Sequence, residues 1–417
     1  MRFERIRESE TSELVLSTSE VTALIGLGKD LASRSKWWGQ AEEAEDDNDR
    51  ERSLIHLQPA SGGRWQVRVP DAVGLISIGD LQIEVAPKIP APHLLFLLEE
   101  GEYLPRISEG RAIVAKDDAL WTIVARWYLC AVERLMRQGL LRGYQRTRDI
   151  LKVVRGSVST MGTARRFYSG KPEFDCNYED FSMDTPLNRM LLAAARRISG
   201  SPSLPEVDRR RAQRICIRMG DIGPVSGSDF RAVVSRDTIR YRDAIQLALH
   251  ILQNEGRGLA HGTRLAWSFL VRTPDAVEIG IRNVLRKALA PNWDVRKERR
   301  TAIGSAVSFN PDLVFDNSFI GDVKYRLASK DWQRSDLYQS LAFMAAFGAQ
   351  RALVIGFQTG HGTKPPNVSI EGFNVSYVTW RAEDNFSPQD AADDLVEKVR
   401  IWLKAGHVET SIPIAVA

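Results

Sequence analysis

The segment from Asn310 to Arg326, NPDLVFDNSFIGDVKYR, places charged side chains inside two short apolar runs. If these runs form a hairpin whose turn is centred on Asn317, Asp312 and Asp322 are equally distant from the turn. Their side chains then face each other, with Cβ atoms roughly 5 Å apart. Two facing carboxylates repel, and a hard divalent cation with oxygen ligands relieves that repulsion. The spacing therefore predicts a cation site on this hairpin.

Lys324 follows Asp322 by two positions, so its side chain is expected on the same face of the strand. An ammonium there can hold a water molecule or stabilise charge that develops on a phosphate. Two alternatives stay open. The hairpin could be exposed, with both aspartates belonging to its turn, or Lys324 could simply form an ion pair with one of them. A β-bulge would also change which residues face each other.

Two flanking helices supply further candidates. Glu278 lies at the edge of an apolar helix face, where its carboxylate could reach a site beside the sheet. An ordinary glutamate at the boundary of that face is an equal alternative. Gln339 and Phe343 are four residues apart and share a helix face, which by spacing alone favours a surface amide next to a core aromatic ring.

The pattern of apolar residues predicts an α+β protein with three domains. In residues 1–112, short apolar runs such as RWQVRVP, VGLISIGDLQIEVAPKI and HLLFLL are broken by Gly and Pro, which favours a small β-rich domain. Residues 41–52, AEEAEDDNDRER, are expected to form a surface loop. Residues 113–260 have helical periodicity and predict a mainly helical region, with Thr185 and Pro186 at the start of one helix.

Residues 261–417 alternate between helical and strand patterns, which predicts an α/β domain around a mixed sheet. The expected order is a helix capped by Thr273, the hairpin, the helix of Gln339, two strands and a final helix. The hairpin and both flanking helices of the candidate site therefore belong to one predicted domain.

Composition restricts the class of protein. The 417 residues include only 3 cysteines, and no membrane-spanning or signal segment stands out, so a cytoplasmic protein without membrane association is expected. Residues 1–110 hold 12 Lys and Arg against 20 Asp and Glu, whereas residues 131–218 hold 18 against 9. The basic middle suggests contact with a polyanion, although a solvated face rich in arginine is an equal alternative.

The candidate residues together resemble the PD-(D/E)xK nuclease superfamily: a helical glutamate, Pro311-Asp312, Asp322-x-Lys324 and the Gln339-x-x-x-Phe343 helix. This resemblance implies a nuclease domain in which Asp312, Asp322 and the carbonyl of Val323 hold Mg²⁺. Glu278 would bind the ion through water or take part in a second site. Lys324 would orient the attacking water or stabilise charge, and Gln339 would position the phosphate.

Most of the chain also resembles the McrC family of McrBC methylation-dependent restriction systems. The resemblance rests on LISIGDLQIEVAPKI with its Pro-Lys, on QGLLRGYQRTRDILKVVRGSV, and on CNYEDFSMDTPLNRMLLAA with Asp184, Asn188 and Arg189. The chain departs from the family at Phe343, where many members carry Tyr. The first sixty residues resemble the family least.

The resemblance implies a partner, a McrB-like AAA+ GTPase hexamer that reads methylated double-stranded DNA and binds this subunit through its N-terminal domain. The sequence holds no GxxxxGK[ST] motif, so GTP is expected to bind to the partner. Residues 295–300, VRKERR, and the basic middle would hold DNA by its phosphates. Two other functions stay open: a non-catalytic adaptor that stimulates the NTPase and anchors DNA, and a stand-alone DNA repair nuclease.

Overall fold

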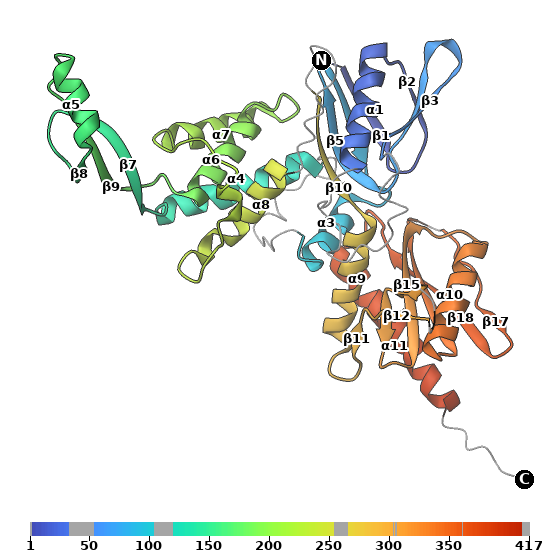
Figure 1. The fold of residues 1–417 in the computed structure, drawn as a ribbon. Coiled ribbons are helices and arrows are strands. Elements are labelled where there is room, and N and C mark those ends of the chain that lie inside the picture. The colour runs from blue at the N-terminus through green and yellow to red at the C-terminus, as the bar shows by residue number, and fades with distance from the viewer. Residues whose placement is uncertain are drawn as a thin grey trace, which may run out of the picture. The chain divides into compact units, whose positions relative to one another are not determined.

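The computed structural model describes residues 2–32, 54–103, 120–253, 266–302, 304, 307–360 and 362–410 (Figure 1). The predicted acidic loop, 41–52, lies outside these residues. The chain forms two compact units. The terminal unit combines Met1–Arg106, Val114–Leu120 and Asn254–Ala417, and the middle unit combines Ile107–Ile113 and Trp121–Gln253. The predicted mixture of helices and sheets is confirmed.

The terminal unit contains a four-stranded sheet in the order β1-β6-β5-β10. Its strands are β1 (Arg2–Arg7), β6 (Leu81–Ala86), β5 (Ala72–Ile78) and β10 (Ala266–Arg272). A second sheet, β2 (Ser12–Leu14), β4 (Trp65–Arg68) and β3 (His56–Pro59), and helix α1 (Thr18–Ala32) share its core. β10 comes from the predicted C-terminal domain, yet it pairs along the whole length of β5. Strands that precede and follow the middle unit in the sequence therefore build this sheet.

Two helices in this sheet region differ from the prediction. The run HLLFLL was grouped with the strand-like segments but lies in helix α3 (Ala91–Glu100), and α1 was not predicted. A short apolar run does not distinguish a strand from a buried helix, and Pro90 before α3 marks a helix start instead. The α1 helix contains the residues of IGLGKD, so this segment forms no phosphate-binding loop.

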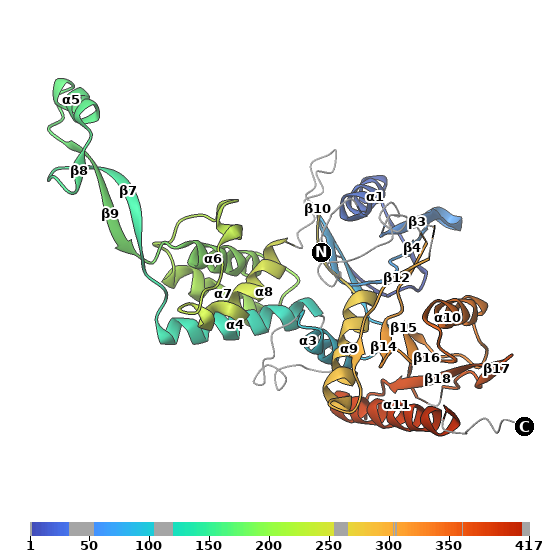
Figure 2. The same cartoon turned by 60° about the horizontal axis from the view of Figure 1, so that its bottom comes forward.

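The middle unit holds the predicted helices α4 (Leu120–Gln138), α6 (Pro186–Ser199) and α8 (Arg242–Gln253), together with α7 (Glu206–Arg218). It also has an arm that was not predicted. In the arm, β7 (Gly143–Leu151) pairs with β9 (Phe174–Ser182), and β8 (Ser157–Val158) and helix α5 (Thr160–Tyr168) follow β7 in the chain (Figures 1 and 2). Most β7 side chains are exposed, so this strand lacks the buried alternation that reveals strands.

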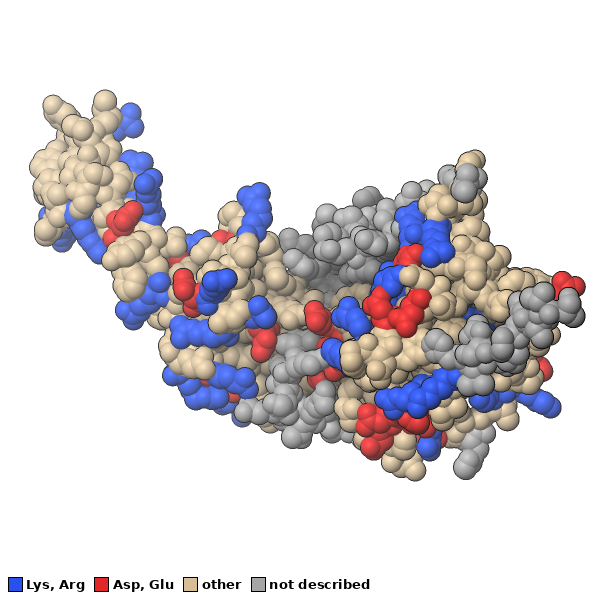
Figure 3. Space-filling view, turned by 90° about the horizontal axis from the view of Figure 1, so that it is seen from below, with Lys and Arg blue, Asp and Glu red and all other residues tan. Residues whose placement is uncertain are grey.

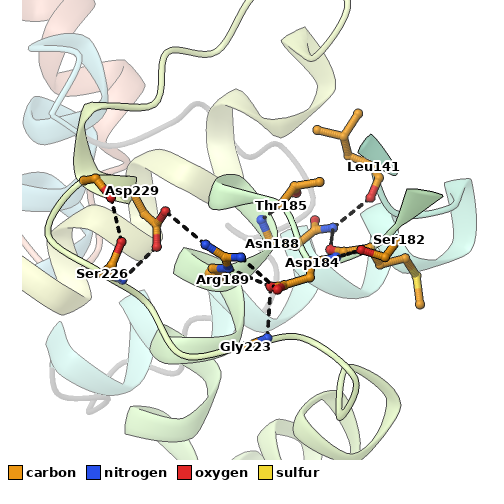
Figure 4. A network of polar contacts seen from close by, with 11 residues as sticks. Leu141, Ser182, Asp184, Thr185, Asn188, Arg189, Gly223, Ser226 and Asp229 are labelled. Carbon is orange, nitrogen blue, oxygen red and sulfur yellow. Dashed lines mark hydrogen bonds and ion pairs between the residues drawn. The ribbon is translucent and has the colours of Figure 1, made fainter. Parts of the chain in front are cut away.

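Asp184, Asn188 and Arg189, which carried part of the family resemblance, hold the middle unit together (Figure 4). Arg189 donates to both carboxylate oxygens of Asp184, at 2.6 and 2.8 Å. The fully buried Asn188 donates to the carbonyl oxygens of Leu141 and Met183, at 2.9 and 2.7 Å. Its own side-chain oxygen accepts from the Tyr241 hydroxyl at 2.9 Å. This segment therefore ties α6 to the chain on either side of it.

The substitution Asn188→Leu should lower the free energy of unfolding of the middle unit by about 3 kcal/mol or more, because it leaves two carbonyls and a hydroxyl without this partner. Urea denaturation followed by tryptophan fluorescence measures this. Asn177→Leu, at an exposed position of β9, is the control and should change the free energy by less than about 0.5 kcal/mol. Equal effects of the two substitutions would contradict the structural role of Asn188.

The terminal unit also contains a six-stranded mixed sheet in the order β11-β14-β15-β16-β18-β17. Its strands are β11 (Val295–Arg296), β14 (Leu313–Phe315), β15 (Phe319–Leu327), β16 (Arg351–Gln358), β18 (Phe373–Arg381) and β17 (Val368–Ile370). Helix α10 (Arg334–Phe347) packs on Val314 and Ile320, while Trp402 of α11 (Pro388–Thr410) packs on Phe315 and Phe319. The two helices therefore cover opposite faces, as the alternation of side chains requires. A short pair, β12 (Arg300–Thr301) and β13 (Ser308–Phe309), lies beside the sheet.

Helix α9 (Pro274–Leu289) joins the two larger sheets. It packs against α3, and a Cβ atom at Gly280 would lie only 2.4 Å from the Leu97 carbonyl oxygen. Thr273 was predicted to cap α9, but its side chain makes no capping bond and instead donates to the Glu8 carboxylate. No helix within the described ranges is long and apolar enough to cross a membrane.

Glu8 is a buried acid at the junction of the two sheets. Burial raises its pKa to about 7, against the opposing effects of Lys88 and Thr273. The folded chain therefore binds a proton here at pH values where the unfolded chain does not, so the free energy of unfolding falls as pH rises from 4.5 to about 7. The full effect is at most about 3 kcal/mol.

In the variant Glu8→Gln this contribution disappears, because the amide does not titrate. Its free energy of unfolding should change less between about pH 5 and 8 than that of the wild type, which chemical denaturation at several pH values would show. A steep decline that is identical in both proteins would contradict the raised pKa of Glu8.

Candidate functional site

The hairpin has the predicted register. β14 and β15 pair Leu313 with Gly321 and Phe315 with Phe319, so the turn is centred on Asn317. Asn317 and the preceding Asp316 have φ of 61° and 46°, the left-handed conformation that tight hairpin turns require. The same register, continued by one pair, sets Asp312 opposite Asp322, with Asp312 one residue before β14.

Asp312 and Asp322 are buried, with 9% and 6% of their surface exposed. Asp312 accepts a hydrogen bond from the Val323 backbone N–H at 2.7 Å. Burial, together with the negative charges of Glu278 and Asp322, raises the pKa of Asp312 well above its usual range, and the Val323 bond only partly opposes this. The site therefore holds more negative charge than its surroundings readily stabilise.

Lys324 lies on the same face of β15 as Asp322. Its Nζ is 2.7 Å from Asp322 Oδ2 and donates to Gln339 Oε1 at 2.8 Å. The sequence left two arrangements open, and the structure contains both: Asp312 faces Asp322, and Lys324 forms an ion pair with Asp322. Gln339 is half-buried and bound to Lys324 rather than a free surface amide, and Phe343 belongs to the core beneath α10.

Glu278 reaches the site from α9, as predicted. Its Oε1 accepts from Arg282 at 2.7 Å and from Lys297 at 2.9 Å. Burial alone would raise its pKa, but a hydrogen bond with Asp312 and the charges of Lys297 and Arg282 leave the pKa of Glu278 below its usual value. The pKa values of Glu278 and Asp312 are shifted in opposite directions because the two carboxyl groups contact each other, so they titrate as a pair.

Two cations of this site were missed or misassigned from the sequence. Arg282 is one helical turn after Glu278, a spacing that predicts an i,i+4 pair, and its Nε also donates to the Asp312 carbonyl at 2.7 Å. Lys297 was grouped with basic residues expected on DNA phosphates, but it contacts Glu278. Only the folded sheet brings β11 beside α9, so spacing alone could not reveal this contact.

The predicted metal ligands agree with a hard cation in donor type, since carboxylate and carbonyl oxygens are the ligands that Mg²⁺ prefers. Within the described residues, however, no group of three or more His, Cys, Asp or Glu side chains is arranged to hold a metal ion. Glu278 is engaged by Arg282 and Lys297, and Asp322 by Lys324. The site thus has oxygen ligands suited to Mg²⁺, but two of its carboxylates, Glu278 and Asp322, form ion pairs with Lys and Arg side chains of the chain itself.

Comparison with known proteins decides the family. Residues 67–355 match the family described as "McrBC 5-methylcytosine restriction system component". The chain belongs to the McrBC family. This confirms the resemblance inferred from the sequence motifs.

One solved structure shares the fold of the chain. One chain, from a tetradecameric assembly of Thermococcus gammatolerans McrB AAA+ hexamers with bound McrC, shares 16% identity with a TM-score of 0.69; the match covers 95% of the present chain and 100% of that one. A cryo-EM structure of the Thermococcus gammatolerans McrBC complex matches with 17% identity and a TM-score of 0.49, covering 69% of the present chain and 88% of its own. No curated protein matches.

Without a bound cation, Asp312→Asn should make this McrBC protein more stable, by about 1 kcal/mol or more at pH 8. The amide removes the buried negative charge, while its oxygen can still accept from Val323. Thermal or urea denaturation in the presence of a chelator measures the change. Asp331→Asn, at an exposed position, should have no measurable effect, and a destabilised Asp312→Asn variant would contradict the predicted repulsion.

Proposed function

We propose that the chain is a Mg²⁺-dependent DNA endonuclease, the cutting subunit of a McrBC-type restriction complex. The observation that carries the proposal is the pairing of Asp312 with Asp322 at the position set by the hairpin register, with Lys324 bound to both Asp322 and Gln339. The order α9, β14, β15, α10, β16 around a mixed sheet supports a PD-(D/E)xK nuclease domain. Membership of a restriction-system family supports DNA as the substrate.

Asp312, Asp322 and the Val323 carbonyl would hold Mg²⁺, and Glu278 would bind it through water or take part in a second site. When bound, the ion would lower the pKa of a coordinated water and neutralise charge on the scissile phosphate. Lys324 would release Asp322 and turn its ammonium to that water or to the phosphate. Gln339 holds Lys324 Nζ in place, so its proposed role shifts from contacting the phosphate to orienting the lysine.

DNA would be held by its phosphates, which gives affinity without sequence choice. On the face seen in Figure 3, Lys and Arg side chains are spread over the arm and the rest of the middle unit rather than gathered in one patch. In the segment 295–300, Arg296 and Arg300 both bind Glu298, so part of its positive charge is already compensated. The middle unit is therefore the stronger candidate for backbone contacts.

The proposed partner is a McrB-like AAA+ GTPase hexamer acting on methylated double-stranded DNA in the cytoplasm. The similar Thermococcus gammatolerans structure is an assembly of McrB AAA+ hexamers with bound McrC. The segment IGLGKD is helical in the present chain, which is consistent with GTP binding to the partner instead. In this arrangement the partner selects the DNA and the present chain cuts it.

The test combines the chain with a McrB-type GTPase, GTP, Mg²⁺ and methylated or unmethylated DNA. Asp312→Ala and Lys324→Ala should each reduce the cutting rate by at least about a hundredfold, because they remove a metal ligand and the ammonium next to it. Both variants should still stimulate GTP hydrolysis. Gel analysis of DNA products and phosphate release measure the two activities separately.

Three outcomes separate the alternatives. Variants that cut as well as the wild type would show that the site is wrongly assigned. Stimulation of GTP hydrolysis without cutting by the wild type would favour the non-catalytic adaptor. Cutting by the wild-type chain alone, without GTP or partner, would favour a stand-alone repair nuclease.

A further inference from the structure

The Pro-Lys that ends LISIGDLQIEVAPKI has no role in the proposed chemistry, yet its lysine contacts the strand that carries the site. Lys88 follows β6 of the N-terminal sheet, and only 13% of its side chain is exposed. Its Nζ donates to the backbone carbonyl of Tyr325 in β15 at 3.1 Å. Tyr325 directly follows Lys324 in the chain. A residue 237 positions away thus binds the backbone next to a proposed site residue.

This contact falls where β15 lacks regular pairing. β15 pairs with β16 from Ile320 to Val323 and again at Leu327, and the register shifts between Val323 and Leu327. Lys324 and Tyr325 lie inside this interruption. A backbone carbonyl in such a gap needs another donor, and the Lys88 ammonium supplies it.

The Tyr325 side chain is fixed by the same lysine. Lys88 Nζ lies 4.7 Å from the centre of the Tyr325 ring, and that ring makes an edge contact with Phe357 of β16, with centroids 5.4 Å apart. Side chains alternate along a strand, so Tyr325 points away from the face of Asp322 and Lys324. Lys88 therefore fixes this part of β15 from the side opposite the proposed chemistry.

The lysine is itself held by acids of the N-terminal sheet. Its Nζ is 3.5 Å from Asp71 Oδ1 and 3.9 Å from Glu8 Oε1. Glu8 in turn accepts from Thr273, at the start of the helix that carries Glu278. The cluster of Glu8, Asp71, Lys88 and Thr273 thus lies between the N-terminal sheet and two elements of the site.

We infer that Lys88 is a positioning residue for the proposed nuclease site, and that it makes the placement of Asp322 and Lys324 depend on the N-terminal sheet. The inference rests on the proposed function. A displacement of about 1 Å at a reacting group can reduce a rate about a hundredfold. A donor that fixes the backbone one residue from Lys324 therefore has a direct effect on cutting.

The first measurement needs no activity. Hydrogen exchange of the full chain, read by mass spectrometry on peptides covering 319–327, should be at least about tenfold faster in Lys88→Met than in the wild type. Lys88→Arg keeps a donor and should restore slow exchange. Lys398→Met is the matched control, because Lys398 also binds a strand carbonyl, that of Thr379 in β18, and a carboxylate, that of Asp394. It should leave the 319–327 peptides unchanged.

The second measurement is cutting in the assembled complex as a function of Mg²⁺ concentration. Lys88→Met should cut about tenfold more slowly and need more Mg²⁺ for half-maximal rate, while its stimulation of GTP hydrolysis stays within about twofold of the wild type. Lys88→Arg should recover most of the rate. If Lys88→Met does not fold, the double variant Glu8→Gln/Lys88→Met replaces it. The added substitution, Glu8→Gln, removes the Glu8 charge that would otherwise lose its lysine partner.

The outcomes keep the two proposals apart. Unchanged exchange in Lys88→Met, or an equal increase in Lys398→Met, would overturn the positioning role whether or not the chain cuts DNA. A normal rate and Mg²⁺ dependence in Lys88→Met, in a complex that Asp312→Ala inactivates, would also overturn it. Equal cutting by wild type and Asp312→Ala would instead remove the proposed function, and hydrogen exchange alone would then decide whether Lys88 orders β15.

Discussion

The register of β14 against β15 is the constraint on which the candidate site depends. A slip of one residue would turn Asp322 and Lys324 to the opposite face of the sheet. Apolar contacts on both faces prevent that slip, because Val314 and Ile320 pack in the core beneath α10 while Phe315 and Phe319 pack on Trp402. The same slip would remove these contacts. The apolar residues of the hairpin thus determine where its charges lie.

The negative charge of the buried carboxylates is only partly compensated by neighbouring cations. Lys324, Lys297 and Arg282 each reach a carboxylate, yet the pKa of Asp312 stays raised. Uncompensated negative charge lowers the stability of the folded chain, and functional sites often lower stability in this way. Burial also means that any ion entering the site would interact with these acids through a medium that screens charge weakly.

The sequence predicted those parts of the fold that depend on local pattern. Periodicity, capping residues and turn chemistry predicted helices α4, α6 and α8, the hairpin turn at Asn317 and the mixed C-terminal sheet. Helix α3 was missed because its apolar run is too short to show a period, and the arm was missed because no residue of β7 is buried. The pairing of β10 with β5 spans nearly two hundred positions, which no local pattern encodes.

The candidate site divides in the same way. Asp312, Asp322 and Lys324 share one hairpin, so their mutual placement followed from counting positions around the turn. Glu278 and Gln339 were expected near the hairpin, and the structure adds which atoms they contact. The contacts of Lys297 with Glu278 and of Lys88 with the Tyr325 carbonyl were not predicted, because each lysine lies on a strand or loop distant in sequence from its partner. Tertiary contacts of this kind leave no trace in residue spacing.

The placement of β10 has a consequence for how the chain folds during synthesis. The N-terminal sheet lacks its last strand until Ala266–Arg272 has been made, so β5, every residue of which is buried in the finished protein, begins as an open edge. An open apolar edge can pair with other chains. The whole middle unit is synthesised during that interval. Helix α9 begins two residues after β10 ends. Synthesis therefore completes the first sheet just as it reaches the first helix of the domain that holds the site.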